Sequence, residues 1–152
     1  MAREVIILNS PIFKVADTEL GLATGQAVEC QVTSAVVTAS ANFQTIPSTG
    51  CAPASQSPGA TSWALDLAWL QDWHVATGLS WFAFENDGQP VWFELTPNSA
   101  DAANKLTGNA FAVAGSYGGT FGDGSAATAT ATWPCLDKPT VPTPVAAATA
   151  EA

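Results

Sequence analysis

Apolar and polar side chains alternate with a period of two along much of this chain. The clearest case is the stretch SWALDLAWL, residues 62–70. Its large apolar side chains all fall on one face: Trp63, Leu65, Leu67 and Trp69. A helix would send these side chains to different sides of its axis, whereas a strand keeps them together. The stretch therefore predicts a half-buried strand with Trp63 and Trp69 in the core.

Four further segments carry the same period, the last of them weakly: 28–36, 91–96, 127–133 and 106–114. In the first segment, Val32 and Val36 share the apolar face and Thr33 lies on the opposite face. In the third, threonine alternates with alanine up to Trp133, and Pro134 ends the ladder because it has no amide hydrogen to donate. The set predicts a mainly β fold of two packed antiparallel sheets, a β-sandwich or barrel.

One short α-helix is expected between these strands. Leu79, Phe82 and Ala83 follow the i, i+3, i+4 spacing of a buried helical stripe, and Thr77 can cap its start. Residues 86–88, Asn-Asp-Gly, would end the helix because glycine adopts a left-handed conformation at little cost. The same Asp-Gly pair can instead form the turn of a β-hairpin, which stays the alternative.

Composition divides the chain into three parts: an N-terminal arm at 1–14, one β-domain at 15–140 and a flexible Pro- and Ala-rich tail at 141–152. Ile12 and Phe13 belong to the expected arm. Within the domain, residues 38–60 are rich in Ser, Thr, Pro and Gly, and residues 115–125 are dominated by glycine. Both segments are predicted to be long loops, which in compact domains are usually functional or disordered.

Charged residues make up only 11% of the chain, and thirteen acids against four bases give a net charge of −9. An average globular protein has about 25% charged residues. We therefore expect much of this surface to be covered by other protein chains. No Lys or Arg lies between Lys14 and Lys105. Specific nucleic-acid binding is excluded, because such proteins place cations against the phosphates.

The residues that could carry catalysis or bind a metal are few. His74, the single histidine, lies two residues from Asp72, but no nucleophile motif accompanies the pair. Cys30, Cys51 and Cys135 lack paired spacing and are expected to be small buried hydrophobes in a reduced, cytoplasmic protein. No secretory signal or membrane-spanning run is apparent. We expect no enzyme activity, no metal, no cofactor and no membrane contact.

Three aromatic residues fall outside the predicted apolar stripes: Trp81, Phe84 and Trp92. Exposed Trp and Phe are typical of a protein interface and also of a sugar-binding platform. The low surface charge favours the interface. These three residues are the candidate subunit interface.

Five segments, taken in order, resemble the major tail tube proteins of long, non-contractile-tailed phages, particularly those of actinobacterial hosts. They are VECQVTSAVVT (28–38), SWALDLAWLQDW (62–73), GLSWFAFENDGQPVWFELTP (78–97), AGSYGGTFG (114–122) and WPCLDKPT (133–140). The resemblance covers roughly residues 14–140. The alanine-rich tail and the scarcity of basic residues depart from the usual pattern of these proteins.

The resemblance implies two packed sheets with one flanking helix, and a structural protein without an active site. Subunits of such proteins form rings, usually hexameric, that stack into the tail tube of the virion. The tube is built in the host cytoplasm around a tape measure protein and meets terminator and tail-tip or baseplate proteins. It later conducts DNA that it does not bind specifically.

A channel that passes DNA should repel it, because each bound phosphate would retard movement. Polar positions that alternate with core positions are the candidate lumen residues: Glu29, Gln31, Thr33 and Asp66. Other functions remain open at this point. A capsid decoration protein would share the low charge, a carbohydrate-binding β-sandwich would use the exposed tryptophans, and a small enzyme is the least favoured.

Overall fold

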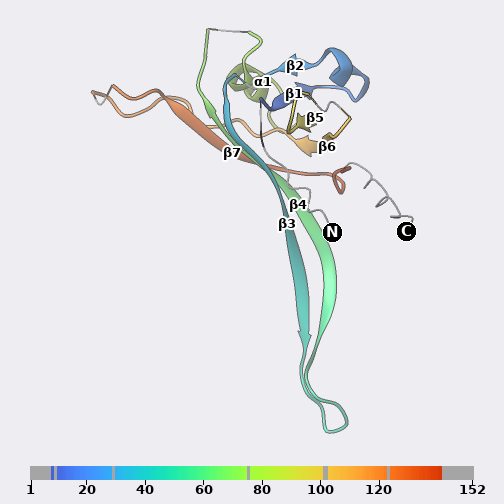
Figure 1. Ribbon diagram of the computed structural model, residues 1–152. Helices are drawn as coiled ribbons and strands as arrows, with labels where there is room; N and C mark the ends of the chain where they lie inside the picture. Colours follow the sequence, from blue (N-terminus) through green and yellow to red (C-terminus); the bar gives the residue numbers. More distant parts are fainter. Residues whose placement is uncertain are drawn as a thin grey trace, which may run out of the picture.

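In the computed structural model the chain folds mainly into β-strands, arranged in two antiparallel sheets (Figure 1). The structure describes residues 8, 10–28, 30–74, 76–100, 103–122 and 124–141. Within these residues there is one α-helix, and neither sheet closes into a barrel. The predicted fold class of two packed antiparallel sheets with a short flanking helix is confirmed.

One sheet has four strands in the order β2-β1-β5-β6. Its strands are β2 (Gln26–Ala27), β1 (Ile12–Ala16), β5 (Pro90–Thr96) and β6 (Leu106–Phe111), and the 3-10 helix η1 (Leu20–Thr24) connects β1 to β2. Because β1 lies inside this sheet and buries Phe13, the prediction that Ile12 and Phe13 belong to an arm is wrong. Residues 1–7 of the expected arm and 142–152 of the expected tail lie outside the described residues.

The other sheet has three strands in the order β3-β4-β7: β3 (Val32–Ile46), β4 (Ser55–Leu70) and β7 (Thr128–Pro134). The prediction of a long loop at 38–60 is wrong, because β3 and β4 continue through it as a hairpin. Pro58 and Gly59 resemble loop residues in the sequence, and the small polar side chains around them show no buried face. The strand signal is absent because both faces of this segment are exposed.

A β-bulge changes the phase of β3 near its start. The pairing with β4 passes from Val32 directly to Ser34, which leaves Thr33 as an extra residue. Beyond the bulge, Val37 packs against the core while Val36 is 52% exposed. The prediction that Val32 and Val36 share the core face is therefore wrong, since one extra residue moves every later side chain to the opposite face.

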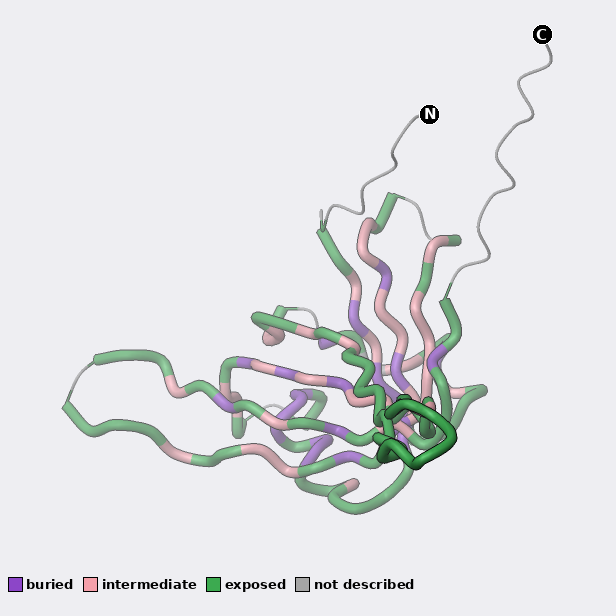
Figure 2. Tube along the Cα trace, turned by 90° about the horizontal axis from the view of Figure 1, so that it is seen from below, coloured by how far each residue is buried: buried purple, intermediate pink, exposed green. Residues whose placement is uncertain are grey.

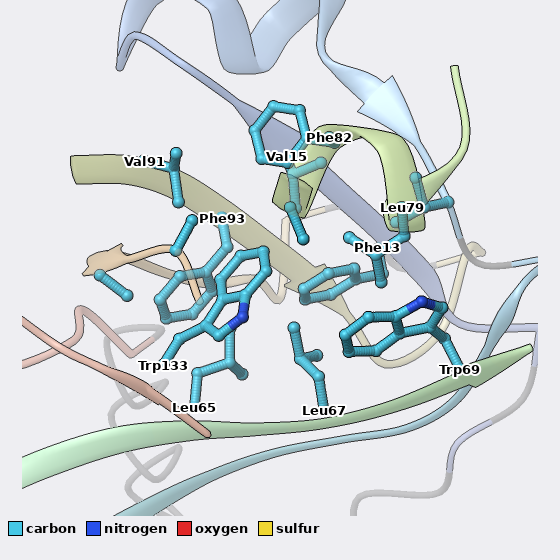
Figure 3. Close-up of a cluster of buried hydrophobic side chains, with 14 of the residues drawn as sticks. Phe13, Val15, Leu65, Leu67, Trp69, Leu79, Phe82, Val91, Phe93 and Trp133 are labelled. Atoms are coloured by element: carbon cyan, nitrogen blue, oxygen red, sulfur yellow. The ribbon is translucent and has the colours of Figure 1, made fainter. Parts of the chain in front are cut away.

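The core lies between the two sheets, where the buried residues concentrate, while the glycine-rich loop is exposed (Figure 2). Trp69 of β4 and Trp133 of β7 are fully buried and face Phe13 and Phe93 of the other sheet (Figure 3). The Trp133 indole donates to the Val113 carbonyl at 3.0 Å, so its polar atom is satisfied. The prediction of Trp69 as a core residue is confirmed.

Trp63 differs from Trp69 because it is only half-buried. It pairs with Ala39 on one side, and on the other side its carbonyl accepts from the amide of Cys135, the residue directly after β7, so Trp63 lies at the last position where a third segment accompanies β4. The alternation along β4 therefore predicts the face of Trp63 but overestimates its burial.

The helix α1 (Leu79–Glu85) confirms the predicted helix, and it packs Leu79, Phe82 and Ala83 into the core. Its cap differs from the expected one. The N-cap position is Gly78 rather than Thr77, and the first amide, that of Leu79, donates to the Gln31 side-chain oxygen at 2.7 Å. After the helix, Gly88 has a φ of 78°, which glycine adopts without strain.

Trp133→Ala tests the core. Loss of the indole leaves a cavity between the sheets and should lower the free energy of unfolding by about 3–5 kcal/mol. Urea denaturation followed by circular dichroism measures the change. The matched control is Phe121→Ala, at a side chain that is 97% exposed, which should change the same quantity by less than about 0.5 kcal/mol. Equal losses in both variants would contradict the assignment of Trp133 to the core.

Candidate assembly surfaces

The β3–β4 hairpin projects from the body of the domain as a two-stranded arm (Figure 1). β7 pairs with β4 as far as Ala64, and the Cys135 amide bonds to the Trp63 carbonyl, so the arm beyond Trp63 has no third strand. Its tip is closed by a bridge between Thr49 and Ala52. The eight residues 39–46 of β3 extend about 25 Å. A two-stranded hairpin is marginally stable alone in water, so we expect this arm to rest against another chain.

Two large apolar side chains on the arm are open to solvent. Phe43 is 60% exposed and Ile46 is 49% exposed, in a segment where almost every residue is classed as exposed. The two strands also pack closely at a second bulge, which lies between Ala41 and Phe43 of β3. There a Cβ atom on Gly59 would lie 2.6 Å from the carbonyl oxygen of Asn42, so the position requires glycine. The arm is thus a regular two-stranded hairpin that exposes two large apolar side chains to solvent.

The three-stranded sheet has β3 at one edge and β7 at the other. The Gln71 amide donates to the Ala127 carbonyl at 2.9 Å. The Cys135 amide donates to the Trp63 carbonyl at the same distance. In an antiparallel pair these bonds alternate along the strand, so Thr130 turns its amide and carbonyl away from β4. Among the described residues no backbone group pairs with this edge at Thr130, so it is open to another strand.

The outer face of the same sheet carries Asp66 in an open groove with a mixed polar and apolar lining. Its two carboxylate oxygens accept hydrogen bonds from the Thr38 hydroxyl at 3.1 Å and the Thr132 hydroxyl at 2.8 Å. The remaining groove is lined by small side chains, Ser34, Ala68 and Thr130 among them. Within the described part of the chain the one ion pair, Lys105 with Glu94 at 3.5 Å, involves the other sheet. The groove is therefore acidic and lacks a cation.

The structure does not place the other candidate lumen residues with Asp66 on one surface. Gln31 is half-buried and holds the start of α1 through the Leu79 amide. Thr33 lies in the bulge, and its hydroxyl donates to the Ala68 carbonyl at 3.0 Å. Glu29 lies outside the described residues. Gln31 and Thr33 thus have local structural contacts, and their lumen role stays a prediction, as it does for Asp66.

Two of the three candidate interface aromatics lie together on one surface. Trp81 and Phe84 of α1 stack with ring centroids 5.8 Å apart. The rings of Tyr117 and Phe84 form a T-shaped pair with centroids 5.9 Å apart, and the ring centroids of Trp73 and Tyr117 lie 6.2 Å apart. We call these four residues the aromatic cluster. Together with Ser80 they line a hollow of about 220 Å³ whose surface is almost entirely apolar.

Trp92 is not part of the aromatic cluster. It is half-buried on β5, where it pairs with Ala16 on one side and Asn109 on the other. Its role at an interface stays a prediction, separate from that of Trp81 and Phe84.

The sequence analysis did not assign Trp73 and Tyr117 to a site. Trp73 lies just beyond β4, and Tyr117 lies in the glycine-rich loop after β6. Gln71 brings the two segments together, because its side-chain amide donates to the Gly118 carbonyl and accepts from the Gly118 amide, both at 2.9 Å. No local periodicity could have shown this contact; the single tyrosine beside two glycines was the only signal.

Tyr117 is also the residue of the cluster whose ionisation is perturbed. Burial raises the pKa of the phenol above its ordinary value of 10.0, and the negative charge of Asp87 raises it further. The phenol donates a hydrogen bond to the Ser80 carbonyl at 2.9 Å. The folded state therefore favours the neutral phenol, which keeps the hydrogen bond and avoids a second negative charge beside Asp87.

The pair of His74 and Asp72 forms a turn. The carboxylate of Asp72 accepts from the backbone amide of His74 at 3.1 Å. No group of three or more metal-ligating side chains occurs in the described ranges. No helix among the described residues has the length and apolar character needed to cross a membrane.

The thiols are less buried than expected. Cys30 and Cys51 are exposed, so their prediction as core residues is wrong. The reason is that Cys30 lies in the turn before β3 and Cys51 lies at the tip of the arm. Cys135 is partly buried against the core, and this burial raises the pKa of its thiol above 9.0.

Comparison of the sequence with protein-family models and with curated proteins gives no match.

Spectrophotometric titration of Tyr117, the single tyrosine, tests the environment of the cluster. Its midpoint in the folded protein should lie above 10.0, and unfolding in guanidinium should return it to the ordinary value. Asp87→Asn should lower the folded midpoint but leave it above 10.0, because burial remains the larger cause. Since the neutral form is favoured in the fold, this contribution to stability is present below pH 10.0 and falls as the pH rises further. A folded midpoint at or below 10.0 would contradict the described environment.

Proposed function

We propose that this protein is the tail tube subunit of a long, non-contractile-tailed phage, which assembles as stacked rings. The observation that carries the proposal is the two-stranded arm, a formed hairpin that extends past the core with both of its faces exposed. An element of this kind is stabilised when neighbouring copies cover it. The ordered resemblance described above adds the particular assembly, a hexameric ring within a tube.

The open edges of the three-stranded sheet supply the contact within a ring. Pairing β7 of one copy with β3 of the next would continue the sheet from subunit to subunit. Closure of such a head-to-tail arrangement removes both free edges of the three-stranded sheet, which an isolated domain must otherwise protect. The low content of charged residues, 11%, agrees with a surface that is largely covered after assembly.

The outer face of this sheet suits the lining of a DNA channel. Small hydroxyl and methyl side chains line the groove, and its charge comes from Asp66. Phosphates that pass such a face find no cation to bind, so transit meets little electrostatic resistance. In this proposal the tape measure, terminator and tail-tip proteins are partners of the tube, and DNA is a passenger.

The aromatic cluster is the observation that favours the main alternative, a carbohydrate-binding module. A capsid decoration protein is the other alternative. Purified protein seen by electron microscopy separates them: hollow tubes or rings support the proposal, and a uniform monomer at high concentration contradicts it.

Shortening the arm tests its role in assembly. The variant replaces residues 41–61 with an Asn-Gly turn between the paired residues Ser40 and Ser62. No core residue is removed, so the domain should keep its thermal midpoint to within a few degrees, while tubes and rings disappear. Negative-stain microscopy and sedimentation measure assembly, and circular dichroism measures folding. The matched control is Phe121→Ala, an exposed change outside the arm that should assemble normally. Normal tubes from the shortened chain would sink the proposed role of the arm.

Thr130→Pro tests the open edge of β7. Proline removes the amide that points away from β4, so the ladder inside the subunit is kept and the edge is blocked. We expect a folded monomer that no longer polymerises, with a loss of at least about tenfold in the association constant. Thr130→Val keeps the amide and should assemble like the parent. If both variants assembled equally, β7 would not be a subunit contact.

A further inference from the structure

We propose that the aromatic cluster binds the proline-rich C-terminal segment VPTPVAAA, residues 141–148, of a second copy of this chain. This proposal extends the proposed function and rests on it, because assembly into rings brings the second copy close to the cluster. It assigns a receptor surface and a ligand that the resemblance does not supply.

The chemistry of the cluster suits proline. Trp73, Trp81, Phe84 and Tyr117 present ring faces and edges around one shallow hollow. Grooves lined by such rings bind proline-rich segments, which are already extended in the polyproline II form and lose little entropy on binding. The hollow of about 220 Å³ is smaller than the roughly 300 Å³ or more that a drug-sized ligand needs. Short proline side chains match this size.

Most of the polar groups around the hollow already form hydrogen bonds within the domain, which argues against a sugar. The Ser80 hydroxyl accepts from the buried Trp69 indole at 2.9 Å. The Ser80 carbonyl accepts from the Tyr117 phenol, and the Trp73 indole donates to Gln71 at 3.1 Å. A carbohydrate site needs several free donors and acceptors beside its rings. The Trp81 indole has no hydrogen-bond partner among the described residues, and one donor of this kind suffices for a peptide carbonyl.

The charge around the cluster suits the same segment. Asp87 is close enough to Tyr117 to raise the pKa of the phenol, so the cluster lies in a negative field. Residues 139–150 contain no charged side chain. The segment therefore approaches without repulsion, whereas a phosphate or an acidic peptide would be repelled.

Chain length makes the contact intermolecular. The cluster lies beside the start of β7, because Gln71 joins Gly118 to Thr128. The chain leaves the domain beyond the other end of β7, where Thr140 pairs with Thr107 (Figure 1). The seven residues of β7, Thr128–Pro134, span about 20 Å and lie between the cluster and the point where the chain leaves the domain. Pro144 lies three residues after Val141 and reaches at most about 11 Å from it. The prolines thus reach a neighbouring copy and not their own cluster.

A complementation experiment with full-length chains tests this contact. Both partners carry Thr130→Pro, which removes sheet-edge assembly. One partner also carries Trp81→Ala, and the other carries Pro142→Ala with Pro144→Ala. Each protein alone lacks one half of the contact, and their mixture restores one complete pair. Sedimentation velocity should show monomers for each alone and a one-to-one complex for the mixture.

A peptide experiment measures the same contact directly. The probe is a fluorescein-labelled peptide of residues 138–150, titrated into the full-length Pro142→Ala/Pro144→Ala protein and followed by anisotropy. Binding should weaken about tenfold or more when the two prolines of the peptide are replaced by alanine, or when Trp81→Ala is introduced into the protein. Leu20→Ala, at a side chain that is 93% exposed and lies outside both the arm and the cluster, is the matched control and should bind like its parent.

The outcomes separate this inference from the proposed function. Peptide binding without tubes would overturn the tail tube proposal and leave the inference standing. Tubes without peptide binding or complementation would overturn the inference alone. Binding of chitohexaose or maltohexaose at the cluster, with no response to the peptide, would also overturn it and assign the cluster to carbohydrate. Equal binding of the proline and alanine peptides would show that proline recognition is wrong.

Discussion

The architecture depends on β4, one strand that lies in two environments. Over its last residues Leu65, Leu67 and Trp69 are buried between the sheets. Over its first half only β3 pairs with it, and no layer covers either face. Hydrophobic burial anchors the strand at one end, while the other end has only the hydrogen-bond ladder of a hairpin. The core thus anchors an arm whose own residues do not belong to the core.

Two separate surfaces of the domain are available for the association proposed above. The edges of β3 and β7 offer backbone groups, and their pairing depends on strand geometry rather than on particular side chains. The aromatic cluster offers ring surface, and its binding depends on the shape and chemistry of the ligand. Asp66 belongs to neither surface, since its hydroxyl partners hold it on the outer face of the sheet. Asp66 therefore gives this face a negative charge, and the ion pair of the described residues, Lys105 with Glu94, lies on the other sheet.

The candidate site could be predicted only in part. Trp81 and Phe84 fall off the buried stripe of α1, so their exposure follows from helical periodicity alone. Tyr117 joins them from a loop more than thirty residues further along the chain, through Ser80 and Gln71 contacts that have no sequence signature. Gln31 shows the opposite error. Its polar position in an alternating segment suggested an open face, but its side chain caps the helix.

The sequence by itself determined which stretches form strands with one buried face. Residues 127–133 and 62–70 carry their alternation locally, and burial of every second side chain needs no knowledge of the partner strand. Only the tertiary structure decided the phase of β3 after Thr33, the length of the arm and the convergence of the cluster. A bulge is defined by the register of one strand against another, so it cannot be recognised in one strand alone. An arm that is exposed on both faces has no alternation of apolar and polar residues that would predict its strands. These features depend on pairing between distant residues, which local pattern does not encode.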